Sequence, residues 1–271
     1  MWKAVVCALA VACSPVIAAA EVAGYVLAVQ GRWSLQGAGA VLVVGAPVPP
    51  GSQLVVAAPA LGDHIVVVAS RSGAVLASRR CDTATACATP LRLQRADNPA
   101  DATMQRLVDR VFARLAGEPD RYVVTLSRGR APLDDRILPL DERRVDLAPV
   151  LADFPAGAYE VRLSPLRCRG ERACRERPIR EHVDWQPGVR GLAGLDDVGP
   201  GLYEIAVRAA AGDPARDRAR GWVLLLPASE HEAAEKRYRS GVTLAERWGS
   251  AVAADERRSF TRALLDALLE P

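Results

Sequence analysis

The amino-acid sequence predicts a mainly β, multidomain protein in which two β units are separated by one helix and followed by a helical hairpin. Segments that alternate between apolar and polar residues recur in two separate regions. One stretch of helical periodicity lies between these regions, and two more follow them. With 271 residues the chain is long enough for about two domains of roughly 100 to 200 residues each.

The overall composition excludes several classes of protein. Half of the residues are apolar, 25% are charged and 5% are aromatic, which excludes collagen, coiled coils and disordered chains. The net charge is only +3, so we expect no nucleic-acid partner. All but two of the 35 basic residues are arginine. This bias is typical of a GC-rich genome, so the arginine content alone does not indicate ligand binding.

Residues 1–20 have the features of a secretory signal peptide. A short basic start at Lys3 precedes an apolar run that ends in Ala18, Ala19 and Ala20. We expect this segment to be removed and the mature protein to be periplasmic, with no transmembrane segment after cleavage. An alternative is a lipoprotein attached at Cys13, although Ala10 stands where a bacterial lipobox normally has leucine.

Four cysteines remain in the expected mature chain, in two pairs of equal spacing. Cys81 and Cys87 are separated by five residues, and so are Cys168 and Cys174. An even number of cysteines in an exported chain predicts disulfides. We expect the two small-loop bonds 81–87 and 168–174, although four cysteines allow three connectivities. Because a disulfide lowers the entropy of the unfolded chain, each bond would stabilise the protein by about 2 kcal/mol.

Residues 21–95 are expected to form a small all-β barrel or sandwich. The first strand alternates from Tyr25 to Leu35 and places Trp33 on its core side. Glycine and proline separate the strands that follow, and the last two form a hairpin through Ser72 and Gly73. After the first strand, the expected strands span 41–44, 54–57, 64–69 and 74–80.

Residues 24–76 resemble the FecR-type periplasmic β domain. The resemblance is carried by a Gly-x-Val-x-x-Val-x-Gly strand from Gly24 to Gly31, two turn glycines and the later Ser-Gly hairpin. The turn glycines are Gly45 and Gly51, and the sequence departs from the family at Ala46 and Ser52, where aspartate is frequent. The resemblance implies a non-catalytic sensing or scaffolding module, here without the family's membrane anchor and cytoplasmic segment.

Residues 96–120 are expected to form a linker helix, because apolar residues from Met104 to Leu115 recur at helical spacing before Gly117 and Pro119. Residues 121–227 then alternate again, starting at Tyr122. The segments 157–163 and 201–207 echo each other at an offset of 44 residues, which is too few for a seven-stranded sandwich. We therefore expect two equivalent strands of one sandwich. Their Gly-x-Tyr start resembles a strand of immunoglobulin-like domains and implies an immunoglobulin-like β-sandwich.

Residues 228–271 are expected to form a helical hairpin broken at Gly249 and Ser250. Its apolar positions are Tyr238, Val242, Ala245, Trp248, Phe260, Leu264, Leu265, Leu268 and Leu269. Packing against the preceding sandwich is the simplest role. The alternative is a dimer, or docking of a partner subunit, through an exposed stripe on these helices.

The sequence shows no catalytic constellation, so we expect no enzymatic activity, metal or cofactor. The histidines His64, His182 and His231 stand singly. Adjacent carboxylates occur in three loops and are expected to be solvated, namely Asp134-Asp135, Asp141-Glu142 and Asp196-Asp197. The alternative is a cell-wall hydrolase whose groups meet between the β domains. A deep pocket lined by His64 or the acidic loops, with shifted pKa values, would favour it.

A cysteine-bracketed segment between two expected strands is the densest charged feature. Its candidate binding residues are Arg167, Arg169, Arg172, Arg175, Arg177 and Arg180. Guanidinium groups on a pinned loop suit a phosphate or an anionic glycan, although an exposed loop of an arginine-biased protein explains the same pattern. Trp185, just before a Pro-Gly turn, is the candidate exposed aromatic. We predict an exported cell-envelope binding or scaffolding protein, with an envelope protein or an anionic group as its partner.

Overall fold

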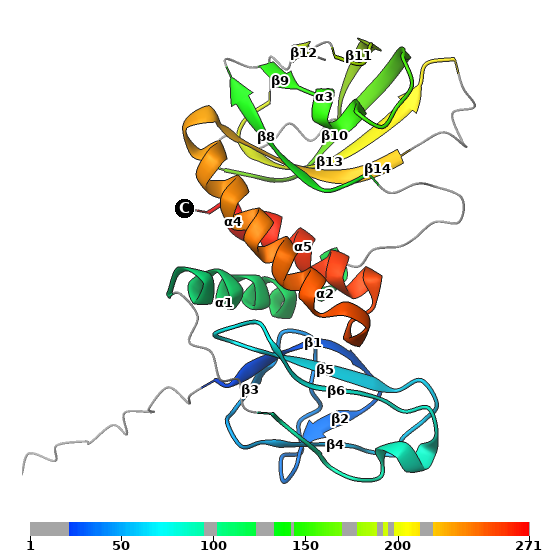
Figure 1. Ribbon diagram of the computed structural model, residues 1–271, viewed down its shortest axis with the longest axis vertical. Helices are drawn as coiled ribbons and strands as arrows, with labels where there is room; N and C mark the ends of the chain where they lie inside the picture. The colour runs from blue at the N-terminus through cyan, green and yellow to red at the C-terminus, as the bar shows by residue number, and fades with distance from the viewer. Residues whose placement is uncertain are drawn as a thin grey trace, which may run out of the picture.

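The structure, a computed structural model, describes residues 22–94, 102–122, 133–141, 144–169, 178–188, 192–194, 198–211 and 219–270. The fold is mainly β, as predicted, and its elements form three layers (Figure 1). An N-terminal β unit and a larger curved sheet lie on opposite sides of a layer of helices. None of the helices in these ranges is long and apolar enough to cross a membrane.

The N-terminal β unit consists of two small sheets that enclose an apolar core. Four strands pair in the order β3-β1-β5-β6 and three in the order β2-β4-β7. These strands are β1 (Gly24–Gln30), β2 (Trp33–Leu35), β3 (Pro47–Val48), β4 (Gln53–Val56), β5 (His64–Ala69), β6 (Val75–Arg80) and β7 (Leu91–Arg92). Trp33 is 1% exposed and lies in the core between the sheets, as its place in the alternation predicts.

Two expectations for this unit need correction. The predicted first strand divides at Gly31, which has a positive φ of 91°, so β1 and β2 belong to different sheets. A bulge between Val26 and Ala28 shifts the register of β1, and the helix layer covers the second face of this strand. β1 is therefore buried on both faces. Residues 41–44 form only an isolated bridge instead of the expected strand.

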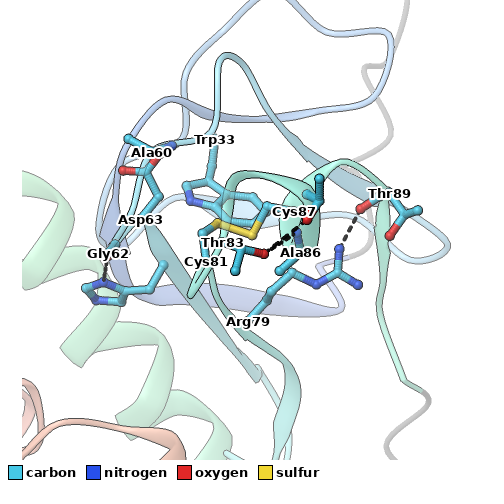
Figure 2. Close-up of a disulfide and its surroundings, with 12 residues drawn as sticks. Trp33, Ala60, Gly62, Asp63, Arg79, Cys81, Thr83, Ala86, Cys87 and Thr89 are labelled. Carbon is cyan, nitrogen blue, oxygen red and sulfur yellow. Dashed lines mark hydrogen bonds between the residues drawn. A yellow bond between two sulfur atoms is a disulfide. The ribbon is translucent and has the colours of Figure 1, made fainter.

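The predicted disulfide between Cys81 and Cys87 is present. The two Cα atoms are 5.6 Å apart, and both cysteines are buried beside Trp33 (Figure 2). The short 3-10 helix η1 (Ala84–Cys87) lies in the loop that the bond closes, and the Ala86 N–H donates to the Thr83 hydroxyl at 3.2 Å. The bond therefore pins a turn onto the core of its own unit.

The middle layer contains helices from distant parts of the chain. They are α1 (Ala102–Gly117), α2 (Pro119–Tyr122), α4 (Ala228–Arg247) and α5 (Ala254–Leu268), with the 3-10 turn η2 (Gly249–Ala251) between the last two. α1 packs against α5, and α5 also contacts α4 and β1. The Phe260 ring lies 6.0 Å from that of Phe112 and 4.8 Å from that of Trp248. One core thus joins the helices to both β layers.

The apolar side chains of the C-terminal hairpin are covered within the chain. Trp248 and Leu264 are 4% and 1% exposed, and Tyr238 and Val242 are half-buried. The Trp248 indole N–H donates to the carbonyl of Gly73 at 2.7 Å. Gly73 has a positive φ of 64° and no room for a Cβ against α4. The hairpin therefore completes its own core, and its described residues do not form the exposed stripe expected of a docking surface.

The third layer is a single sheet of seven strands in the order β11-β10-β13-β14-β8-β9-β12. The strands are β8 (Arg136–Asp141), β9 (Arg144–Asp146), β10 (Gly157–Cys168), β11 (Ile179–Trp185), β12 (Leu192–Gly194), β13 (Gly201–Ala209) and β14 (Ala219–Pro227). Its inner face encloses a second core together with α3 (Ala148–Leu151). The fold is sandwich-like, but one sheet with a parallel β14–β8 pair replaces the two antiparallel sheets expected here. Tyr122 ends α2 instead of starting a strand, and residues 123–130 lie outside the described ranges.

The two segments that echo each other in the sequence are neighbouring strands. β10 and β13 pair antiparallel, and each has its own hairpin partner, β11 and β14. The tyrosines of the echo make the same contact. Tyr159 donates to the Pro155 carbonyl and Tyr203 to the Gly199 carbonyl, both at 2.8 Å and both four residues upstream. Two similar hairpins therefore lie side by side, related by a local two-fold axis through the sheet.

Candidate functional site

Part of the predicted binding segment lies outside the described residues, namely Arg172, Cys174, Arg175 and Arg177. The segment connects β10 to β11, which pair antiparallel as expected for a hairpin. Cys168, at the end of β10, is disulfide-bonded, and its sulfur lies 3.6 Å from the Tyr203 hydroxyl. The candidate binding residues that the structure places are Arg167, Arg169, Arg180 and Trp185.

Arg167 and Arg169 are engaged by the C-terminal part of the chain, which corrects their assignment to a ligand. Arg167 donates to Asp266 of α5 at 3.2 Å and to Glu270 at 2.6 Å. Arg169 pairs with Glu230 of α4 at 2.5 Å. These bonds attach the end of β10 to the helix layer. The sequence did not reveal this role because the partners are 61 to 103 residues away.

Trp185 is a core residue and not an exposed aromatic. Only 4% of it is exposed, and its indole N–H donates to the Phe154 carbonyl at 3.1 Å. As the last residue of β11 it alternates with Val183 and faces the inner core of the sheet. The Pro-Gly turn that follows suggested exposure, but the strand still controls the direction of its final side chain.

Arg180 lines a small hollow on the outer face of this sheet. Here one row crosses four strands, since Arg180 of β11 pairs with Arg162 of β10, Arg162 with Ala206 of β13, and Ala206 with Arg220 of β14. We call these four residues the arginine row. Successive residues of the row are separated by the spacing of neighbouring strands, about 4.8 Å. The hollow has a volume of about 150 Å³, and the small side chain of Ala206 leaves room for it.

Two glutamates neutralise part of the charge around the hollow. Glu160 accepts from Arg208, and Glu204 lies 3.4 Å from Arg220. The hydrogen bond from Arg208 lowers the pKa of Glu160, and the charge of Arg180 acts in the same direction. Glu160 is thus held in the ionised form beside Arg208.

Two arginines of the row form no ion pair among the described residues. Within the described ranges, no carboxylate lies within ion-pairing distance of Arg162 or Arg180. The Nε–H of Arg162 is also buried and makes no hydrogen bond with a described residue. The outer face of the sheet therefore presents guanidinium donors around a hollow that could accept an oxyanion.

The local two-fold axis of the two hairpins passes through the middle of the arginine row. Arg162 pairs directly with Ala206, its own counterpart in the 44-residue echo, so the axis passes between them. Glu160 corresponds to Glu204 in the same echo, and each begins the polar face of its strand. Sequence reasoning missed Arg162, Arg208 and Arg220. The echo, combined with antiparallel pairing, was the signal that could have aligned them.

His64 is part of a structural contact between the N-terminal β unit and α5. Its Nε2 lies 2.8 Å from Glu256 Oε1, and its Nδ1 lies 3.3 Å from the Gly62 carbonyl. The hydrogen bond with Glu256 raises the pKa of His64 against the opposing effect of burial. Burial acts to raise the pKa of Glu256, but the hydrogen bonds from His64 and the Ala253 N–H outweigh it and lower this pKa.

Asp135 is buried, which corrects the expectation of a solvated pair with Asp134. The two aspartates and His231 line a groove of about 890 Å³ between β8 and α4. Burial raises the pKa of Asp135, while Arg262 acts to lower it. Its oxygens are occupied, since one accepts from the Trp222 N–H at 2.8 Å and the other lies 3.5 Å from Arg262. The Asp134-Asp135 pair thus does not offer two free carboxylates for hydrolysis.

The remaining acidic pairs do not alter this result. Glu142, Asp196 and Asp197 lie outside the described residues. In the part of the chain that the structure describes, no group of three or more histidine, cysteine, aspartate or glutamate side chains could hold a metal ion. No family model, curated protein or solved structure matches this chain. The arginine row is therefore the candidate functional site.

Proposed function

We propose that the protein is an exported, non-catalytic binding protein of the bacterial envelope that holds an anionic group at the arginine row. The observation that carries this proposal is the direct opposition of Arg162 and Arg180 on β10 and β11. Like charges placed directly opposite each other destabilise an antiparallel pair. The buried, unpartnered Nε–H of Arg162 adds a further cost of about 1 to 3 kcal/mol.

An anionic ligand would offset both costs. Each guanidinium presents several N–H donors in one plane, a geometry that suits phosphate and carboxylate oxygens. The row crosses β10, β13 and β14 and the edge strand β11. The other face of these strands packs on the inner core, so the side chains start from a rigid base. Unfavourable local arrangements of this kind are expected at functional sites, where binding compensates for them.

The location in the envelope is supported by residues 1–20 and by the disulfide between Cys81 and Cys87. We assign to the N-terminal β unit the sensing or scaffolding role that its resemblance to the FecR-type domain implies. The helix layer shares one core with this unit and with the sheet that carries the arginine row. It would therefore hold the two β layers in a fixed relation while the row engages its ligand.

The test measures anion binding by the full mature chain. Calorimetric titration with a sulfated polysaccharide and with polyphosphate should show binding that the double variant R162A/R180A loses. The control variant R237A/R247A removes the same charge from exposed positions of α4 and should bind normally. Equal binding by R162A/R180A and the control would contradict the proposal. Thermal unfolding of each variant shows whether the fold is retained.

A further inference from the structure

The proposed function leaves open which anionic group the arginine row accepts, and the inference below rests on that function. We propose that the hollow takes one compact tetrahedral dianion, a phosphate or sulfate group, seated over Ala206.

The size of the hollow admits a small ligand group. Its volume is about 150 Å³, and a water molecule occupies about 30 Å³ of liquid, so the hollow offers the space of about five water molecules. A phosphate or sulfate group, with five non-hydrogen atoms, fits within this space.

The charge around the hollow favours a dianion over a single carboxylate. Four arginines and two glutamates line it, which leaves a net charge of +2. Glu160 and Glu204 are already beside Arg208 and Arg220, so the uncompensated charge belongs to Arg162 and Arg180. A phosphate group carries a charge of about −1.5 to −2 at neutral pH and accepts hydrogen bonds on several oxygens, so it matches this excess.

The strands place donors on both sides of Ala206. Arg162 and Arg220 belong to the strands that flank β13, and Arg180 lies one strand beyond Arg162. The two-fold axis passes between Arg162 and Ala206, and Arg220 lies on the other side of Ala206, so the arginines reach a group over Ala206 from opposite directions. Towards the helices, Arg262 lies over the Trp222 ring at 4.7 Å from its centroid. Arg180 and Arg220 are exposed at the opposite ends of the row, which leaves room for the rest of a larger molecule that ends in a phosphate monoester.

The ligand group is tested by titrating the full mature chain with inorganic phosphate, sulfate, a phosphate monoester and acetate in an anion-poor buffer. Phosphate and sulfate should bind, and acetate should bind at least about tenfold more weakly because it cannot supply a second charge. Tighter binding of the monoester than of inorganic phosphate identifies the terminal phosphate of a larger molecule as the source. Tighter binding of the inorganic ions identifies the free anion. Equal or better binding of acetate would overturn the inference.

The place of the group is tested by A206L, which fills the hollow and leaves all charges in place. Phosphate binding should fall about tenfold or more, whereas A158L, a control on the same exposed face of β10, should bind normally. R162K keeps the charge but removes the planar fork and should also weaken phosphate binding. Normal phosphate binding by folded A206L would overturn the inference about the hollow. If R162A/R180A still loses polyanion binding in that case, the proposed function stands. If R162A/R180A binds both the polyanions and inorganic phosphate as well as the control R237A/R247A does, both proposals fail.

Discussion

The contact between His64 and Glu256 should make the stability of the protein depend on pH. The pKa of His64 is raised from its usual 6.5, so its contribution is complete below about pH 6.5 and is lost as the pH rises through the folded-state value. The pKa of Glu256 is lowered from its usual 4.5. Its contribution is therefore complete above about pH 4.5 and is lost as the pH falls through the folded-state value. The charged pair stabilises most between these limits.

The size of the effect follows from the exposure of the pair. The His64 and Glu256 side chains are 17% and 19% exposed, and their nitrogen and oxygen atoms are 2.8 Å apart. Exposed ion pairs contribute about 0.2 to 1 kcal/mol. For a partly covered pair that water still screens, we expect the upper end of this range, about 1 kcal/mol.

A double-mutant cycle with H64Q and E256Q measures this coupling. Glutamine at position 256 keeps an acceptor for the Ala253 N–H, which now donates to Glu256 at 2.9 Å. Effects of the nearby Arg80 charge cancel in the cycle. Urea unfolding should give a coupling energy of about 1 kcal/mol at pH 5.5 and well below half of that at pH 8.5. The same coupling at both pH values would refute the assignment of a charged pair.

Three further predictions concern the buried Asp135, the shared core around Phe260 and the disulfide between Cys81 and Cys87. D135N should lower the free energy of unfolding by about 1 to 3 kcal/mol because the amide nitrogen replaces an oxygen that faces Arg258 and Arg262, and these donors lose their buried acceptor. D134N, at a side chain 78% exposed, should change it by under about 0.5 kcal/mol; equal effects in urea unfolding would contradict this. F260A should cost about 3 to 5 kcal/mol by opening a cavity in the shared core, and F260L markedly less; equal losses would argue against a cavity. The double variant C81A/C87A should lose about 2 kcal/mol, and a reductant should destabilise it less than it destabilises the wild type.

Where a pattern is local, the sequence was sufficient. Alternation located β5, β6, β10 and β13, and the 3.6-residue period located α1, because each signal depends only on the direction of successive side chains. The small disulfide loop of Cys81 and Cys87 was predicted for the same reason, since short chain separation brings the two sulfurs together.

Where a side chain depends on a distant partner, the sequence was misleading. Arg167 was expected to bind a ligand but pairs with α5, and Asp135 was expected in solvent but is buried by arginines of the same helix. Neither outcome has a local signature, because the partners follow about 100 residues or more later in the chain. Trp185 failed differently, since its turn signal and its strand alternation disagreed and the alternation prevailed.

By itself the sequence determined where most of the regular strands and the long helices lie and which of their faces are apolar, because these properties follow from residue spacing. It also contained the 44-residue echo and every arginine of the row. Only the tertiary structure decided that the echoing strands are neighbours and that Arg162 opposes Arg180. The reason is physical: strand register depends on contacts along the whole sheet, and a shift of one residue would turn these side chains to the other face.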